Sequence, residues 1–423
     1  MKYQLNDKPS FFSLLMYGLQ WWIVSIPCVV IMGIIMAQLH FSEAGEQIFY
    51  MQKLFAVMGA AMTVQVLWGH RLPLVIGPAS VLLIGILSSL GSGVDAIYTA
   101  ILVGGCLLAA LAYGGGLSRL QALFTPRIVI VILCLIAFTL SPVILRLIFA
   151  GGDHALFRLF FALLLALGMI LLNKLLSGIW KSLVVICGVA LGCLVYFGFF
   201  GFPQLQEVPA TATLSGWIIW PLKFEWGTVL SFLFCYFALI VNELGSIQAV
   251  GRMIGAGQMS GRTTRGVGVT GLANMVSGAL GVAGPVDYSM SPGIIAATGC
   301  ASRYSLIPAG IGLLLCAFFP DFIRLLNAIP EGVMGAVLLY LMASQLSAGL
   351  QMMNREKAVL DFESGLVVGF PLMLALLLSF APEEAVQSIP AWIRPIVGNG
   401  FVMGVIVVVL LEHLVFRKRK QKP

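Results

Sequence analysis

The sequence is poor in charged residues and in histidine. Only 10% of its 423 residues are Asp, Glu, Lys or Arg, 60% are hydrophobic, and four histidines occur in the whole chain. So few charged side chains cannot cover the surface of a soluble globular protein. The composition therefore excludes an ordinary soluble domain and predicts a polytopic membrane protein.

Motifs of the common enzyme classes are also missing. The sequence contains no nucleophile elbow, no H-E-x-x-H pair and no Walker loop. Its eight cysteines lie in apolar stretches without the paired spacing of metal ligands. We therefore expect no enzyme, no cofactor and no metal site, with an intramembrane hydrolase as the alternative from another class.

What the sequence does contain is a series of fourteen apolar stretches of near-spanning length. A longer loop, FPQLQEVPATATLSGW, divides them into seven and seven, and an odd number per half inverts the second half relative to the first. The predicted fold is an all-α polytopic membrane protein built as an inverted repeat. The stretches lie near 11–38, 49–68, 72–89, 96–113, 127–149, 155–173, 182–200, 227–249, 265–281, 284–299, 304–320, 333–350, 362–380 and 396–416.

Positive charge is distributed unevenly over the loops of this topology. With a cytoplasmic N-terminus, 18 of the 24 Lys and Arg residues fall on the cytoplasmic side, as the positive-inside rule requires. Both termini are therefore expected in the cytoplasm, and the basic tail 417–423 is a topology anchor that touches anionic lipid. The net charge of +7 needs no nucleic-acid partner.

Two Gly-Pro segments, VIGPAS at 75–80 and VAGPVD at 282–287, occupy equivalent places in the two halves. Because proline suits the first turn of a helix, Pro78 and Pro285 are each expected to begin a half-helix after an extended stretch. Paired broken segments of this kind indicate a transporter site near the bilayer midplane, where the positive helix ends meet. The alternative is that each Gly-Pro merely kinks a continuous helix.

Glu243 and Asp287 are the two acidic residues deep inside the predicted spans. All four histidines fall in loops or at span ends, so no buried Lys, Arg or His is expected beside these carboxyl groups. An intramembrane carboxyl group without a partner is suited to carrying a proton through a transport cycle. The alternative is that each carboxyl group only forms hydrogen bonds to the neighbouring backbone.

Several stretches resemble a known family. YGLQWW near the start of the first stretch, NELGSIQA in the eighth, and RGVGVTGLANMVSGALGVAGPVDYSMSPGIIAATGC from Arg265 onward are similar to the nucleobase/ascorbate transporter family, which includes the xanthine and uracil permeases. The resemblance implies uptake of a purine or pyrimidine with protons, or alternatively sodium. It also implies an elevator-like movement of a core domain against a gate domain, and the gate domain as the surface of a possible homodimer.

The resemblance divides the chain into six parts. They are the N-terminus 1–10, core parts 11–113 and 227–320, gate parts 114–226 and 321–416, and the tail 417–423. A bacterial inner membrane is the expected location. Uracil, xanthine and related purines are the expected substrates.

The family's span-ten pattern, Q/E-N-x-G-x-x-x-x-T, is only partly kept. Here it reads MSPGIIAAT, so Gly293 and Thr298 match, whereas Met290 and Ser291 replace the acceptor and the amide. The family's span-eight glutamate aligns with Asn242, which leaves Glu243 one residue further on, about 100° around an ideal helix. We predict that Asp287 replaces the missing span-ten acceptor; the alternative is a changed substrate.

Three further departures concern spans one, eight and nine. Ser246 stands where the family often has Asp or His, Thr270 where it often has Asp, and Trp21 where it often has His. Trp21 is interpreted mainly as an interface anchor.

The predicted substrate site and its supports come from four segments. A sulfate-permease-like anion carrier of the same architecture remains the second transport hypothesis. The substrate-binding residues are Gln20, Ser25, Cys28, Ala79, Ser80, Asn242, Glu243, Ser246, Asp287, Tyr288, Ser289, Met290 and Ser291; Glu243 and Asp287 also couple protons, and Gly77, Pro78, Gly284, Pro285, Gly293 and Thr298 are structural.

Overall fold

The structure is a computed structural model, and it describes every residue except 122, 151–153, 178, 203–221, 391 and 417–423. The described residues are mostly helical (77%). Most of the predicted loop between the two halves and the whole basic tail lie outside the described residues.

The first half contains ten helices and one short strand among its described residues. These are α1 (Phe11–His40), α2 (Ala44–Leu67), β1 (Ile76–Pro78), α3 (Ser80–Ser88), α4 (Val94–Tyr113), α5 (Leu117–Gln121), α6 (Pro126–Thr139), α7 (Ser141–Ile148), α8 (Ala155–Leu175), α9 (Ile179–Ser182) and α10 (Val184–Phe200), with a 3-10 turn at Leu90–Ser92.

The second half begins with the same order of elements, so that α1, α2, β1 and α3 are matched by α11, α12, β2 and α13. Its elements are α11 (Trp226–Met253), α12 (Met259–Leu280), β2 (Pro285–Asp287), α13 (Ser291–Thr298), α14 (Ile307–Cys316), α15 (Pro320–Asn327), α16 (Glu331–Arg355), α17 (Phe362–Ser379), α18 (Glu383–Gln387), α19 (Arg394–Val397) and α20 (Gly400–Leu410). A 3-10 turn at Arg303–Leu306 precedes α14, and a π turn at Leu411–Val415 follows α20.

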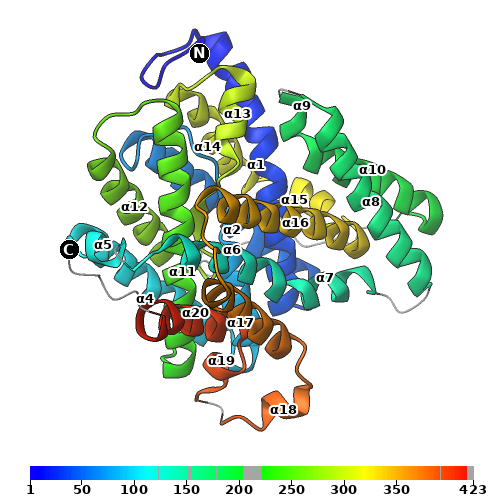
Figure 1. Ribbon diagram of the computed structural model, residues 1–423. Helices are drawn as coiled ribbons and strands as arrows, with labels where there is room; N and C mark the ends of the chain where they lie inside the picture. Colours follow the sequence, from blue (N-terminus) through cyan, green and yellow to red (C-terminus); the bar gives the residue numbers. More distant parts are fainter. Residues whose placement is uncertain (122, 151–153, 178, 203–221, 391, 417–423) are drawn as a thin grey trace, which may run out of the picture.

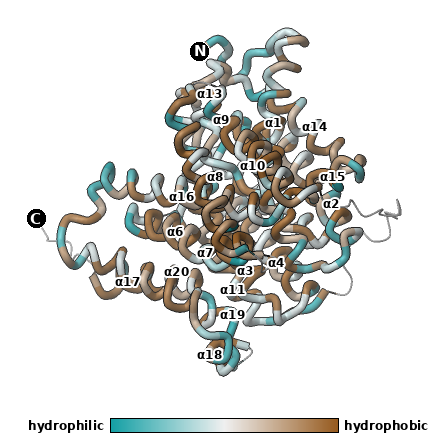
Figure 2. Tube along the Cα trace, turned by 90° about the vertical axis from the view of Figure 1, so that its right-hand side faces the viewer, coloured by the Kyte–Doolittle hydropathy of each residue, from teal (hydrophilic) through white to brown (hydrophobic). Residues whose placement is uncertain are grey.

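Seven helical segments among the described residues are long and apolar enough to cross a membrane. They are α1, α4, α6 with α7, α8, α11, α16 and α17. The segment from Arg303 to Asn327 bends by 88° between α14 and α15 and gives an eighth if it is counted as one span. Figure 2 shows hydrophobic residues along most of the packed helices. The count of fourteen spans stays a prediction.

The helices pack in two groups. In one, α4 lies against α12, α2 against α14, and α1 and α11 against the strand pair. In the other, α16 lies against α6, α7 and α8, and α17 against α20. Figure 1 shows α12 and α11 on one side of the molecule and α8 and α10 on the other.

The α4–α12 contact depends on glycine. A Cβ on Gly271 of α12 would lie 2.5 Å from the backbone nitrogen of Ala109, and a Cβ on Gly105 of α4 would reach the backbone of Met275. Backbone atoms cannot move aside as a flexible side chain can, so the two helices approach this closely only because both positions lack a Cβ.

We expect Gly271→Ala to destabilise the folded protein by about 1–3 kcal/mol, because the added Cβ overpacks a backbone contact. The apparent Tm of the purified protein in detergent should fall. Gly168→Ala on α8 is the matched control, since its Cβ would meet no atom within 4 Å, and alanine is the better helix former. Equal Tm values for the two variants would show that the close α4–α12 approach does not hold the fold.

Candidate functional site

The two Gly-Pro segments meet as a two-stranded antiparallel sheet inside the first group of helices. β1 and β2 join the two halves of the chain at their broken segments. The paired residues are Ile76 with Asp287, Gly77 with Val286, and Pro78 with Pro285. The pairing continues beyond the strands. The amide of Ala79 donates to the carbonyl of Gly284 (3.0 Å), and the amide of Tyr288 donates to the carbonyl of Val75 (2.8 Å).

A short helix follows each strand, as predicted, but neither helix begins at its Gly-Pro proline. Pro78 and Pro285 lie in the strands, and α3 and α13 begin at Ser80 and Ser291. The two prolines face each other at one end of the pair, where proline's missing amide hydrogen removes no inner ladder bond. Pro292 occupies the first turn of α13 instead. The alternative of a kinked continuous helix is wrong for both segments.

Each Gly-Pro glycine makes room for a side chain that fixes the strand pair. A Cβ on Gly77 would lie 2.7 Å from the ring of Tyr288, whose hydroxyl donates to the carbonyl of Pro78 (2.7 Å). A Cβ on Gly284 would overlap the side-chain amide of Asn274, which donates to the carbonyl of Pro285 (2.9 Å). The glycines therefore serve close approach, and they allow both strand carbonyls to be bonded.

Glu243 and Asp287 lie together behind the strand pair, with both residues 0% exposed. Glu243, on α11, accepts hydrogen bonds from the backbone amide of Asp287 (2.9 Å) and the hydroxyl of Thr270 on α12 (2.5 Å). Ser246, one turn after Asn242, donates to the carbonyl of Asp287 (3.0 Å). The Glu243 carboxyl group thus holds β2 against α11 and α12.

The carboxyl group of Asp287 has a histidine beside it, which corrects the sequence-based expectation. His70 is 0% exposed, and its Nε2 lies 3.3 Å from Oδ2 of Asp287. The alignment is too poor for a hydrogen bond, and neither Asp287 oxygen has a hydrogen-bond partner among the described residues. The expectation failed because the chain after α2 does not remain at the surface: it turns inward through the buried residues 72–75 to reach β1.

The exposed face of the site is formed by α13 and by the side of α11 that does not carry Glu243. Gly245 and Gly293 are exposed, and a Cβ on either would meet no atom within 4 Å. Ser289 is exposed and Asn242 is half-buried at the edge of the same α11 face. The predicted site residues thus separate into an accessible set, which includes Asn242 and Ser289, and a buried set behind the strands.

The predicted residues on α1 lie near the segment before α13, but Trp21 is not an interface anchor. Trp21 is 1% exposed, and its indole Nε1 donates to the hydroxyl of Ser305 (3.0 Å). Ser25 is buried and donates to the carbonyl of Trp21 (2.7 Å). The sulfur of Cys28 lies 3.8 Å from that of Met290. The interface interpretation failed because α1 begins at Phe11, well before Trp21. Trp21 therefore lies inside the helix and is buried against the turn before α14.

The other predicted residues lie at the starts of the two short helices, on α13 and on α1. Ala79 precedes the first residue of α3, Ser80. Ser291 accepts a hydrogen bond from the amide of Val75 (2.9 Å), and Thr298 donates to a carbonyl one turn earlier in α13. Gln20 is half-buried on α1.

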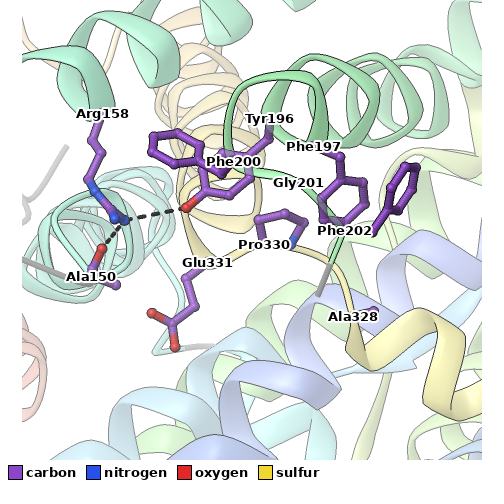
Figure 3. Close-up of a pocket in the computed structure, with 10 residues that line it drawn as sticks. All are labelled: Ala150, Arg158, Tyr196, Phe197, Phe200, Gly201, Phe202, Ala328, Pro330 and Glu331. Atoms are coloured by element: carbon purple, nitrogen blue, oxygen red, sulfur yellow. Dashed lines mark hydrogen bonds between the residues drawn. The ribbon is translucent and has the colours of Figure 1, made fainter. Parts of the chain in front are cut away.

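Two open pockets lie away from the strand pair. One, of about 360 Å³, is lined by Arg158, Tyr196 and Glu331 among others, and Figure 3 shows Arg158 directed toward the Tyr196 hydroxyl and the carbonyl of Ala150. None of its lining residues is a predicted site residue. The other, of about 330 Å³, includes Gln248 on the exposed face of α11.

Comparison with known proteins finds relatives over most of the chain. The Bacillus subtilis uric acid permease PucJ is 24% identical over 396 residues, covering 89% of this chain and 87% of PucJ. The Paenibacillus larvae nucleobase transporter PlUacP is 23% identical over 393 residues, covering 89% of each chain. Among solved structures, the transmembrane domain of the cyanobacterial bicarbonate transporter BicA superposes with a TM-score of 0.62 at 14% identity, covering 89% of this chain and 98% of that one.

A family model assigns the chain. The xanthine/uracil permease model, described as the Permease family, matches residues 12–384. The relatives are permeases and not enzymes. This integral membrane protein therefore belongs to the xanthine/uracil permease family.

Proposed function

We propose that the protein is a secondary active transporter that takes up a nucleobase together with a proton. Nucleobase transport is supported by the family and by relatives named as uric acid and nucleobase transporters. Proton coupling is supported by one observation above all: two fully buried carboxyl groups lie at the strand pair, one of them without a hydrogen-bond partner among the described residues. Buried carboxyl groups of this kind are suited to proton exchange.

The proposed fold has fourteen spans in a seven plus seven inverted repeat. We assign the core domain to 11–113 and 227–320, and the gate domain to 114–226 and 321–416. The packing of α4 on α12 and of α16 on α6, α7 and α8 supports this division. An elevator-like movement would carry the strand pair and its site across the gate. Both termini are placed in the cytoplasm of a bacterial cell, with the gate domain as the dimer surface and lipid around it.

The substrate is proposed to bind on the accessible side of the strand pair. Asn242 and Ser289 offer an amide and a hydroxyl, which match the donors and acceptors along the edge of a nucleobase. Gly245 and Gly293 leave space beside them for a planar ring. Asp287, behind the strands, is the proposed proton site, and Glu243 holds it in place.

An anion transporter of the same fold is the second candidate. The observation that favours it is the likeness to BicA and to the murine anion transporter Slc26a9, which superposes with a TM-score of 0.61 at 13% identity. Two buried carboxyl groups would repel an anion when ionised, which favours a neutral base. Competition of a bound labelled nucleobase by uracil and xanthine, but not by sulfate or bicarbonate, is the expected result.

Ligand binding gives the simplest test of the substrate class. A nucleobase present at about 100 times its Kd should stabilise the folded protein by about 2.7 kcal/mol and raise its apparent Tm. Asn242→Ala should reduce this rise, whereas Asn354→Ala, at an exposed amide on α16, should not. A Tm that responds to sulfate or bicarbonate and to no nucleobase would contradict the proposed substrate.

A further inference from the structure

His70 occupies a buried position between α2 and β1 that the transport mechanism above does not use. Its ring is directed inward, with Nε2 3.3 Å from Oδ2 of Asp287. Among the described residues, this nitrogen and both Asp287 oxygens lack a hydrogen-bond partner. A buried imidazole nitrogen and a buried carboxyl group without hydrogen bonds cost free energy of folding unless the two groups stabilise each other.

The other ring nitrogen fixes which proton His70 carries. The backbone amide of Leu72 points its hydrogen at Nδ1 over 2.9 Å, so Nδ1 is an acceptor and carries no hydrogen. In a neutral imidazole the hydrogen then resides on Nε2, the nitrogen that faces Asp287. A second proton on Nδ1 would collide with the Leu72 amide hydrogen. His70 is therefore held as a neutral ring whose Nε2–H group lies beside the carboxyl group of Asp287, 3.3 Å from Oδ2 and without hydrogen-bond alignment.

Further hydrogen bonds fix the backbone of His70. Arg262, on α12, donates through Nη1 to the carbonyl of His70 (2.9 Å). The amide of His70 donates to Oε1 of Gln65 (3.2 Å). Gly266 leaves the space beside the ring, because a Cβ there would lie 3.0 Å from that of His70.

The same contacts connect His70 to both carboxyl groups. Gln65 donates to the hydroxyl of Thr270 (2.8 Å), which donates in turn to Glu243. Glu243 accepts from the amide of Asp287, the residue that His70 faces. The charged or titratable groups around the imidazole are thus Asp287 and Glu243 on its inner side and Arg262 at its backbone.

We propose that His70 is a positioning residue that stabilises the ionised form of Asp287 through its Nε2–H group and so sets the pH at which Asp287 gives up its proton. His70 does not carry the proton itself, because Leu72 occupies the nitrogen that would have to receive one. This inference rests on the proposed function in one respect, namely that Asp287 is the coupling site.

Two amide variants separate this role from simple support of the turn. In His70→Gln the terminal amide nitrogen lies near the place of Nε2, so a donor toward Asp287 is kept. In His70→Asn the side-chain oxygen lies near the place of Nδ1, so the acceptor for Leu72 is kept and the donor is lost. Infrared titration of the protonated Asp287 carboxyl band, assigned by its loss in Asp287→Asn, is the measurement.

We expect His70→Asn to move the titration midpoint of the band upward by about one pH unit, because the N–H dipole that lies 3.3 Å from the ionised carboxylate is lost. His70→Gln should stay close to the parental midpoint, and its proton-driven uptake should exceed that of His70→Asn. A parental midpoint in His70→Asn, or an equal shift in both variants, overturns the proposal.

The role of His70 and proton coupling through Asp287 can be disproved separately. If the band shifts as predicted but uptake by the parental protein ignores the proton gradient, the His70 contact is upheld and proton coupling through Asp287 is wrong. If uptake follows the gradient but the band does not shift in His70→Asn, the transport function stands and the role given to His70 is wrong.

Discussion

Asp287→Asn is expected to lower proton-driven nucleobase uptake by about 100-fold or more, the size of the loss that removal of one proton-transferring side chain typically causes. Asparagine keeps the size of the side chain but cannot exchange a proton. The backbone amide and carbonyl of residue 287 bond to Glu243 and Ser246 independently of the side chain, so the strand pair should persist. Uptake of labelled base into proteoliposomes with an imposed pH gradient measures the effect.

The control is Asp321→Asn, whose carboxyl group is 87% exposed and pairs with Arg324 at the surface. This variant should transport at the parental rate, because exposed ion pairs contribute little. Asp287→Asn should still bind the base and keep the parental Tm. Parental uptake with unchanged pH dependence would remove Asp287 from the coupling mechanism.

Glu243→Gln is expected to reduce uptake by about tenfold, because one of the two hydrogen bonds that the carboxyl oxygens accept is lost. The Glu243 carboxyl group now accepts from both the Asp287 amide and the Thr270 hydroxyl. A glutamine can offer its single oxygen to only one of these donors, so the other loses its acceptor. Uptake and its pH profile in proteoliposomes are the measurement.

A double variant tests whether the two carboxyl groups act together. Residues in one hydrogen-bond network show effects that do not add. Glu243→Gln should therefore cost much less in an Asp287→Asn background than alone. Independent, additive losses, or a Glu243→Gln variant with parental uptake, would show that Glu243 has no part in coupling.

The sequence predicted the broken segments well because their signals are local. Glycine and proline restrict the backbone wherever they occur, and two such pairs at matching places in two inverted halves predict a meeting point. The register of the two strands could not be predicted from these local signals. It is decided by side chains from other helices, such as Asn274 and Tyr288, which fill the space beside Gly284 and Gly77.

His70 and Trp21 could not be found from local sequence. A histidine in a loop and a tryptophan near a span end both have common surface roles, and only the path of the chain decides otherwise. The chain after α2 turns inward, and α1 buries Trp21 against Ser305, a residue 284 positions away. Long-range contacts of this kind leave no periodic signal.

The departures from the family pattern have a physical connection in the structure. Thr270 stands where the resemblance has Asp, and its hydroxyl lies 2.5 Å from Glu243, itself one residue after the aligned position. A carboxylate at 270 would face Glu243 at close range, and like charges there would be costly. The threonine is instead a donor that satisfies the shifted glutamate. The sequence alone showed both changes but not that they touch.

The most direct test of the account is an experimental structure with the nucleobase that gives the largest Tm increase. The base is expected beside the β1–β2 pair, in contact with Asn242 and Ser289 and in the space next to Gly245 and Gly293. A base bound elsewhere, for example in the pocket that Arg158 and Glu331 line, would contradict it.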